Sequence, residues 1–495
     1  MKLGYLKMWE MPCTYFRSRE FFLRILGAIN LAAFVSFWIQ VDGLIGSNGI
    51  LPVKDFLELV SRQVGFVRYW ELPTLCWLNS SDAFLHFLCG AGAFLSIVLI
   101  FGIAPAPVLF FLWVLHLSLV NVGQDFLEFQ WDNLLLEVGF LAIFLAPLRL
   151  RPRLTDESPP PKLTLWFFGW LLFRLMFSSG LVKFTSGDPT WRSLTALQYH
   201  YETQPLPTWI GWYAHQLPAW FQKFSCGVMF AIEGVVPFFI FGPRPFRLFA
   251  SSVLIGFQIL ILLTGNYCFF NLLTIALCLL LIDDDAWPLS FRAKRAEGTN
   301  QGSRAWPSWA VAPVMILILL VSANQMTRLL GIKIRWPEPV PAVIRTASAF
   351  RSVNGYGLFA VMTTSRPEII VEGSNDGITW RGYEFKWKPG DVSDAPRFNL
   401  PHQPRLDWQM WFAALGSYRQ NPWFINFLKR LLEGSPPVLK LLEKNPFPDF
   451  PPRYVRAIVY DYRFTDLLTL RARGEWWRRS YKGLYCPVIS RVSVD

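Results

Sequence analysis

Long apolar runs dominate the first two thirds of this 495-residue chain and set its fold class. A run of about 18 apolar residues is long enough to cross a bilayer as a helix. Nine stretches approach that length: residues 21–41, 83–103, 105–122, 133–148, 163–181, 219–241, 246–264, 266–282 and 309–323. Because the chain is 53% hydrophobic and only 17% charged, we predict a polytopic α-helical membrane bundle of about nine spans. The first run lacks a small-residue cleavage pattern after it, so we expect a retained anchor.

Basic residues predict the orientation of this bundle. They precede the first span and fill the fourth, sixth and eighth connections: Lys2, Lys7, Arg17, Arg19, Arg149, Arg151, Arg153, Lys162, Arg244, Arg247, Arg292, Lys294, Arg295 and Arg304. All of these positions fall on one side of a nine-span bundle, so the positive-inside rule predicts a cytoplasmic N-terminus. Residues 1–330 would then form the membrane domain, with the long connections 42–82 and 182–218 on the outer side, where binding and chemistry concentrate.

The hydropathy changes near residue 335 to that of a soluble domain. Residues 355–389 alternate as strands do, and Ser374-Asn375-Asp376-Gly377 supplies a tight hairpin turn. Helical patterns follow at 405–417, 421–433 and 437–444, before two more strand-like stretches at 453–464 and 475–490. We therefore predict that residues 331–495 form an outer α+β domain with antiparallel strands and a helical insertion.

This C-terminal domain carries 24 Lys and Arg against 15 Asp and Glu. A solvated surface with charges of both signs is the favoured explanation of this excess of basic residues. The alternative is a docking face for an acidic partner. Trp408, Trp411 and Phe412 recur at helical spacing, a pattern that more often marks a core than a partner groove. No basic block with interleaved aromatic residues and no zinc-finger spacing appears, so nucleic acid is not an expected partner. The seven cysteines have no paired spacing, and we expect neither a metal site nor a cofactor.

Ionisable residues inside membrane spans are costly and therefore informative. They are His86, His116, Glu137, Arg174 and Glu233. The first four are expected in the outer half of the bilayer. Glu137 and Arg174 would form an ion pair between adjacent spans, and a purely structural role is the favoured interpretation. The alternative is a polar cavity in which the histidines carry protons.

Lys183 lies just beyond the span that contains Arg174. A lysine at a helix end commonly extends to the membrane surface, which is the favoured interpretation. A lysine held in a partly desolvated pocket can instead serve as a base. If the protein were an enzyme, its site would consist of Lys183, Glu137, Arg174, His86 and His116. Downstream, Asp188-Pro189 predicts the start of an amphipathic helix with Trp191, Leu194, Leu197 and Tyr201 on one side.

Several long strings resemble the lipase maturation factor family. They are GLIGSNGILP after the first span, FLEFQWDNLLLEVGFLAIFLAP, RLMFSSGLVKFTSGDPTW, NYCFFNLLTIALCLLLIDDD, PHQPRLDWQMWFAA and NPWFINFLKRLLEGSPPVLKLLEKNPFP. Together they extend over nearly the whole chain. The resemblance implies a multi-pass membrane protein that assists the folding and assembly of secreted lipases, or other secreted hydrolases, without chemistry of its own. It implies the endoplasmic reticulum membrane in a eukaryote and the cytoplasmic membrane in a bacterium.

The same resemblance favours the outer loops and the C-terminal domain as the client-binding side, next to membrane lipid. Trp408, Trp411 and Arg405, with Lys183 and Trp191 from the 182–218 connection, are the residues expected to contact a partner. A more distant likeness links SGLVKF and DPTW to vitamin K-dependent γ-glutamyl carboxylases. It implies the alternative function, a membrane enzyme that uses Lys183 as a base on a quinol or a lipid.

Overall fold

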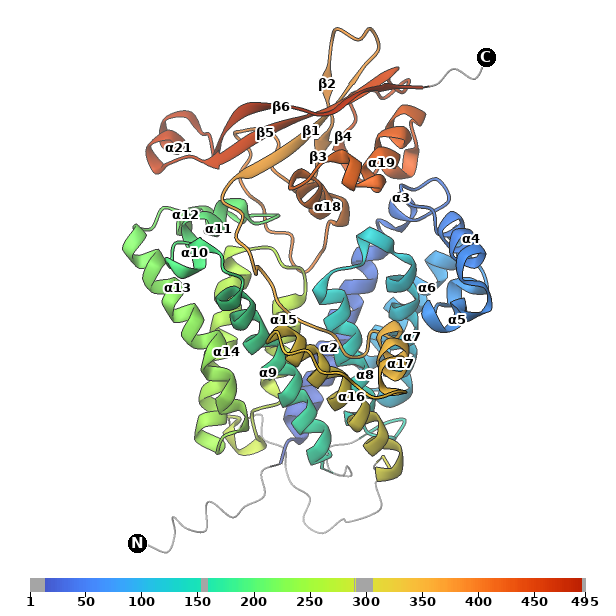
Figure 1. Ribbon diagram of the computed structural model, residues 1–495, viewed down its shortest axis with the longest axis vertical. Coiled ribbons are helices and arrows are strands. Elements are labelled where there is room, and N and C mark those ends of the chain that lie inside the picture. Colours follow the sequence, from blue (N-terminus) through green and yellow to red (C-terminus); the bar gives the residue numbers. More distant parts are fainter. Residues whose placement is uncertain (1–13, 153–158, 289, 291–305, 492–495) are drawn as a thin grey trace, which may run out of the picture.

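The computed structural model describes residues 14–152, 159–288, 290 and 306–491. A bundle of long helices forms one layer, and a sheet with its helices is stacked on one end of that bundle (Figure 1). Cys13 and seven of the basic residues used to predict orientation lie outside the described residues: Lys2, Lys7, Arg153, Arg292, Lys294, Arg295 and Arg304.

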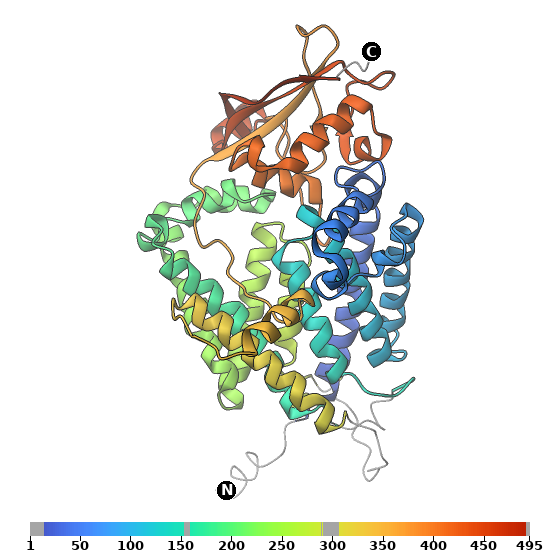
Figure 2. The ribbon, with the colours of Figure 1, turned by 45° about the vertical axis from the view of Figure 1, so that its right-hand side comes forward.

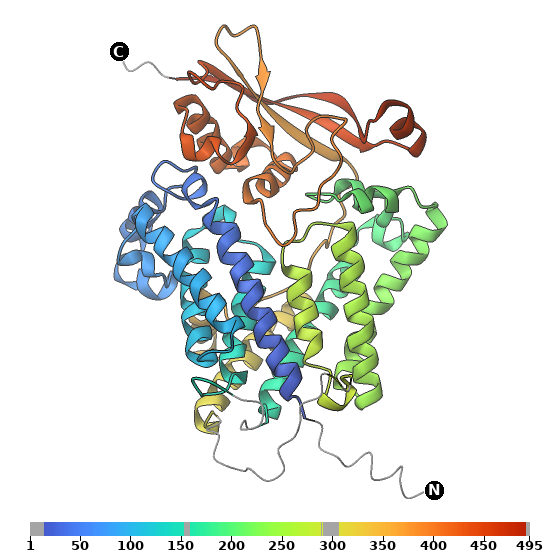
Figure 3. The same cartoon turned by 180° about the vertical axis from the view of Figure 1, so that it is seen from behind.

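Each of the nine predicted spans corresponds to a helix of the bundle. These helices are α2 (Phe16–Trp38), α6 (Asp82–Ile100), α7 (Pro105–Val122), α8 (Gln130–Leu145), α9 (Lys162–Thr185), α13 (Ala219–Gly234), α14 (Arg244–Thr264), α15 (Phe270–Leu279) and α16 (Ser308–Leu329). Figure 3 shows α2 crossing the back of the bundle between the blue and the green helices. Among the described residues, seven helices are long and apolar enough to cross a membrane. The predicted fold class, a helical membrane bundle followed by an α+β region, is confirmed.

Two of the nine helices are shorter than a bilayer requires. α8 has 16 residues and α15 has 10, which at the α-helical rise correspond to about 24 and 15 Å. α15 is shorter than the predicted 266–282 span because its first residues leave the helix: Cys268 has a positive φ of 56°, and the Asn266 amide donates to backbone oxygens of Leu206 and Arg397. Of the nine predicted spans, seven thus correspond to described helices long and apolar enough to cross a membrane, and the other two correspond to the shorter helices α8 and α15.

Six short helices connect the long ones: α3 (Val41–Leu44), α4 (Val53–Val64), α5 (Arg68–Glu71), α10 (Pro189–Arg192), α11 (Leu197–Thr203) and α12 (Trp209–His215). Figure 1 shows α3, α11 and α12 between the bundle and the C-terminal domain, and α4 and α5 beside the bundle. Asp188 caps α10 through the backbone N–H of Thr190, as the sequence predicts. The single amphipathic helix expected from there is wrong, because Leu194 has a φ of 58° and separates α10 from α11.

The C-terminal domain is built on a four-stranded antiparallel sheet of order β2-β1-β5-β6. Its strands are β1 (Arg366–Ser374), β2 (Arg381–Gly382), β5 (Tyr454–Phe464) and β6 (Trp477–Ser490). A second, small sheet joins β3 (Glu384–Phe385) to β4 (Leu442–Lys444). The helices of the domain are α18 (Arg405–Ala414), α19 (Pro422–Glu433), α20 (Pro436–Leu439) and α21 (Leu467–Arg473).

The hairpin predicted at Ser374–Gly377 is confirmed. β1 and β2 pair on either side of it, and the Asp376 carboxylate accepts hydrogen bonds from the backbone N–H groups of Ile378 and Thr379. The helix predicted over 437–444 is wrong in its second half. The chain leaves the helix at Leu439 because residues 442–444 pair with β3, where Lys444 forms an ion pair with Glu384.

α17 (Val340–Ala349) and the segment after it join α16 to β1. We call this segment, residues 350–365, the tether. Figure 2 shows α16 and α17 in front of the bundle and the tether rising from them to the sheet. The Phe350 ring stacks on Trp113 of α7, and the Arg351 guanidinium donates to Asn121 on the same helix. The first part of the region that hydropathy assigns to the outer domain thus packs against the membrane bundle.

Candidate functional site

A buried polar cluster, which we call the Glu137 cluster, joins α8 and α9 to the tether. It consists of Glu137, Arg174, Asn354 and Tyr356. Glu137 and Arg174 form the expected ion pair, and both are almost fully buried. The other oxygen of Glu137 accepts from the Asn354 backbone N–H at 2.8 Å and from the Tyr356 hydroxyl at 2.7 Å. Arg174 also donates to the Asn354 carbonyl at 3.0 Å. Such extra hydrogen bonds are what allow a buried ion pair to offset its desolvation cost.

Lys183 does not extend to the membrane surface. Its ammonium group donates to both carboxylate oxygens of Glu233 on α13, at 2.9 and 2.7 Å, and to the Ser179 carbonyl at 3.1 Å. The Trp191 ring lies 5.7 Å from the same ammonium group. Both charged side chains are about 6% exposed. The expectation of a solvent-seeking lysine is therefore wrong, because α9 continues to Thr185 and Glu233 lies within reach.

Trp191 is buried and contacts the tether. Its indole N–H donates to the Phe359 carbonyl at 3.0 Å. Asp188, three residues earlier, accepts from the Met362 backbone N–H at 2.7 Å. The stretch from Lys183 to Trp191 thus connects α9 to α13 on one side and to the tether on the other.

The two span histidines lie apart from these charged pairs. His86 contacts Asp42 at 2.9 Å and accepts from the Trp38 indole at 2.7 Å, and its side chain is well exposed. His116 is buried with its ring against Phe34. The five residues considered as an enzyme site thus have different contacts: Lys183 with Glu233, Glu137 with Arg174, His86 with Asp42, and His116 with Phe34.

The C-terminal domain is fixed to the bundle by a third buried ion pair. Arg405 at the start of α18 donates to both oxygens of Asp132 on α8, at 2.9 and 2.8 Å, and to the Phe126 carbonyl at 2.6 Å. Trp408 packs edge-on against Trp131 with ring centroids 4.7 Å apart. The Trp411 indole donates to the Thr203 carbonyl at 2.8 Å. Arg405, Trp408 and Trp411 are all buried inside the chain.

The sequence analysis names Glu233 among the ionisable span residues but does not pair it with Lys183, and it does not single out Asp132 as a partner of Arg405. The interpretation of Trp408 and Trp411 as core residues agrees with their burial. For Asp132, the available indication was its position at the start of an apolar run, where a carboxylate needs a counter-charge.

The opposite face of the C-terminal domain carries the edge strand β6, whose strand neighbour within the described residues is β5; its first residue, Trp477, also donates a backbone hydrogen bond to the Val392 carbonyl. Its exposed side chains, which we call the β6 surface, mix basic and apolar types: Arg478, Arg479, Tyr481, Lys482, Leu484 and Val488. An edge strand presents unpaired backbone groups that can pair with another extended chain. The strand is therefore the part of the domain best suited to contact a partner.

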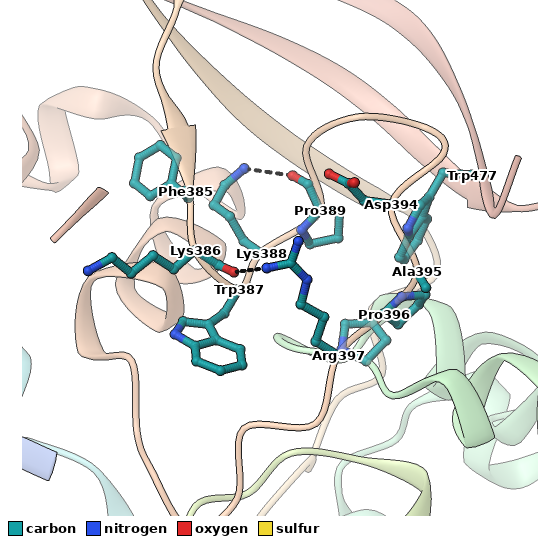
Figure 4. A pocket seen from close by; sticks show the side chains of 11 residues that line it. Phe385, Lys386, Trp387, Lys388, Pro389, Asp394, Ala395, Pro396, Arg397 and Trp477 are labelled. Atoms are coloured by element: carbon teal, nitrogen blue, oxygen red, sulfur yellow. Dashed lines mark hydrogen bonds between the residues drawn. The ribbon is translucent and has the colours of Figure 1, made fainter. Parts of the chain in front are cut away.

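A small hollow beside this sheet has no room for a substrate. Residues 385–389 and 394–397 line it together with Pro207 and Trp477 (Figure 4). Lys388 donates to the Pro389 carbonyl at 3.1 Å, and Arg397 donates to the Lys386 carbonyl. Its volume of about 30 Å³ is close to that of one water molecule.

Metal and thiol chemistry find no support in the part of the chain that the structure describes. There, no three His, Cys, Asp or Glu side chains lie together in a way that could hold a metal ion. The six described cysteines are free and buried. Burial raises the pKa of the Cys76 and Cys486 thiols to about 11, so both stay in the unreactive thiol form at neutral pH.

Comparisons with known proteins agree with the arrangement of bundle and C-terminal domain. Residues 17–289 match the lipase maturation factor transmembrane domain, and residues 352–487 match the lipase maturation factor C-terminal domain. No solved structure matches the chain.

Curated relatives match over nearly the whole chain. Lipase maturation factor 2 of Gallus gallus is 39% identical, over 96% of this chain and 81% of the relative. Lipase maturation factor 2 of Homo sapiens is 35% identical over 95% and 82%, and lipase maturation factor 1 of Bos taurus is 36% identical over 97% and 90%. On both the domain matches and these identities, the chain belongs to the lipase maturation factor family.

Proposed function

We propose that this protein is a membrane-bound maturation factor that assists the folding and assembly of lipases. The match to proteins named lipase maturation factor over at least 95% of this chain carries the proposal. The buried ion pair between Lys183 and Glu233 supports a structural role for Lys183 rather than that of a base, because a base must be free to accept a proton from its substrate. In a eukaryote the site of action would be the endoplasmic reticulum membrane, with the C-terminal domain in the lumen. In a bacterium the C-terminal domain would face outward from the cytoplasmic membrane.

The β6 surface is the proposed contact for the client lipase. Buried residues such as Arg405, Trp408 and Trp411 are occupied within the chain, so in the proposal they position the domain rather than touch the client. The free edge of β6 offers backbone hydrogen bonds to an extended, incompletely folded segment, and Arg478, Arg479 and Lys482 favour acidic segments. Pro487 cannot donate a backbone hydrogen bond, which limits the usable edge to residues 478–485.

Charge reversal on this edge tests the proposal in the intact protein. We expect Arg478→Glu combined with Lys482→Glu to lower secreted lipase activity about tenfold, the effect of roughly 1.4 kcal/mol of lost binding. Membrane abundance should stay unchanged, since both side chains are exposed.

Arg381→Glu is the matched control, because Arg381 is exposed on β2 at the other edge of the same sheet. Undiminished lipase secretion by the β6 double variant would exclude the edge as the client contact. Undiminished secretion in cells lacking the whole protein would exclude the function itself.

A further inference from the structure

A hollow with polar and apolar lining lies between the last turns of α9 and α16, and Arg174, Asn354 and Tyr356 of the Glu137 cluster form part of its wall. We call it the α9–α16 hollow. It encloses about 460 Å³, a volume within the roughly 300–1,000 Å³ range of small-molecule sites. The tether closes one side of it through residues 354–357. The lining does not include Lys183, so the hollow is separate from the Lys183–Glu233 pair.

Two buried polar atoms in the lining have no partner. Arg174 is 2% exposed, and its Nε donates to no atom in the described chain. The amide oxygen of Gln325 is also buried without a hydrogen bond, although its nitrogen donates to the Val353 carbonyl. Leaving a buried polar group without a hydrogen bond is unfavourable, because the group has lost its water and gained no partner. Arg174 and Gln325 both line the hollow, so one unpaired donor and one unpaired acceptor in its wall indicate a ligand that both accepts and donates hydrogen bonds.

The hollow also carries an uncompensated positive charge. Glu137 neutralises Arg174, but Arg328 at the rim is exposed and has no ion-pair partner among the described residues. An anionic group is therefore favoured at this rim, and a guanidinium suits phosphate oxygens in particular.

Apolar side chains form another part of the lining. Val182 and Leu329 are part of the lining, and the neighbouring Ile316, Leu319 and Leu330 are exposed on the surface of α16 and just after it. Exposed apolar side chains on a membrane-spanning helix face lipid chains. A ligand in the hollow would thus have its polar part among Arg174, Gln325 and Arg328, with an apolar part along α16.

We propose that the α9–α16 hollow binds one anionic phospholipid whose headgroup carries hydroxyl groups. The phosphate accepts from Arg328 and Arg174, and a headgroup hydroxyl donates to Gln325. The acyl chains lie along Val182, Leu329 and the exposed apolar face of α16. Basic pockets between membrane helices recognise anionic headgroups in the same manner. This lipid site does not depend on the proposed client function.

Native mass spectrometry of the full-length protein in detergent tests the proposal, with phosphatidylglycerol and phosphatidylcholine as probes. The wild type should bind a single phosphatidylglycerol in preference to phosphatidylcholine. Arg328→Gln should weaken phosphatidylglycerol binding about tenfold, as expected for one lost charge-assisted contact. Arg335→Gln removes an exposed charge from the next segment, outside the hollow, and should bind as the wild type does.

Gly355→Leu provides a second variant that fills the hollow. A Cβ atom added at Gly355 meets no atom within 4 Å, so the variant should fold and lose the bound lipid. Unchanged phosphatidylglycerol binding by Arg328→Gln would overturn the proposal, as would equal binding of phosphatidylcholine by the wild type. Displacement of the lipid by millimolar inorganic phosphate would assign the site to free phosphate and overturn the lipid assignment.

Discussion

The ion pair between Arg405 and Asp132 should determine how firmly the C-terminal domain is docked on the membrane bundle. Both side chains are at most 1% exposed, and Asp132→Asn would leave the Arg405 charge hydrogen-bonded to neutral oxygens, such as the Phe126 carbonyl, without its counter-charge. Removing one member of a buried pair costs about 3–5 kcal/mol. The docking equilibrium should therefore shift by about two to four powers of ten.

Hydrogen exchange followed by mass spectrometry measures this shift. The amides of α18 become accessible when the domain undocks, so their exchange rates should rise by the same factor in Asp132→Asn. Adding Arg405→Met removes the stranded charge and should restore most of the protection, since apolar replacements of buried pairs are often neutral.

An exposed ion pair of the same domain serves as the control. Lys444 and Glu384 are both more than half exposed, and Glu384→Gln should change exchange in α18 by less than about fivefold, or 1 kcal/mol. If Asp132→Asn accelerated exchange no more than this control, or if Arg405→Met failed to rescue it, the reasoning from burial would be refuted.

Two further predictions concern buried titratable groups. Lys183→Met should leave the buried Glu233 charge without its partner and lower the membrane abundance of the protein. Lys183→Met combined with Glu233→Gln should restore both abundance and lipase secretion. Restored abundance without secretion would assign Lys183 a chemical role. Burial, with Arg405 and Lys386 nearby, lowers the pKa of His402 to about 4. The neutral His402 side chain therefore contributes to the stability of the folded protein above pH 6.5, and this contribution is lost as the pH falls towards 4. Protection of α18 should drop by about 2 kcal/mol between pH 7 and 5, and His402→Asn should remove that dependence; an equal slope in the variant would contradict the assignment.

The helical bundle could be predicted from the sequence because span length is set by bilayer thickness and apolar runs are long and unambiguous. α15 is the exception. Asn266 and Cys268 look like part of an apolar run, but the Asn266 amide is recruited by backbone groups more than 50 residues away. Contacts of that range leave no periodicity in the sequence.

Buried charges were harder to predict than helices. Glu137 and Arg174 could be paired from the sequence because they carry opposite charges in consecutive spans. Among the ionisable span residues, no other pair of opposite charges is closer in sequence. Lys183 pairs with Glu233 because α9 and α13 lie close together at these two residues. That proximity depends on the tilt of the helices. Arg405 and Asp132 are separated by 273 positions, and nothing local to either residue distinguishes a docking contact from a solvated charge.

The Glu137 cluster also has a consequence for the order of assembly. Glu137 and Arg174 belong to helices that are synthesised early, but Asn354 and Tyr356, which complete their hydrogen bonds, follow some 180 residues or more behind. During biosynthesis the nascent bundle must therefore hold a partly satisfied charge pair in the membrane until the tether leaves the ribosome. A chain truncated before residue 354 would contain Glu137 and Arg174 but would lack the hydrogen bonds that Asn354 and Tyr356 donate to Glu137.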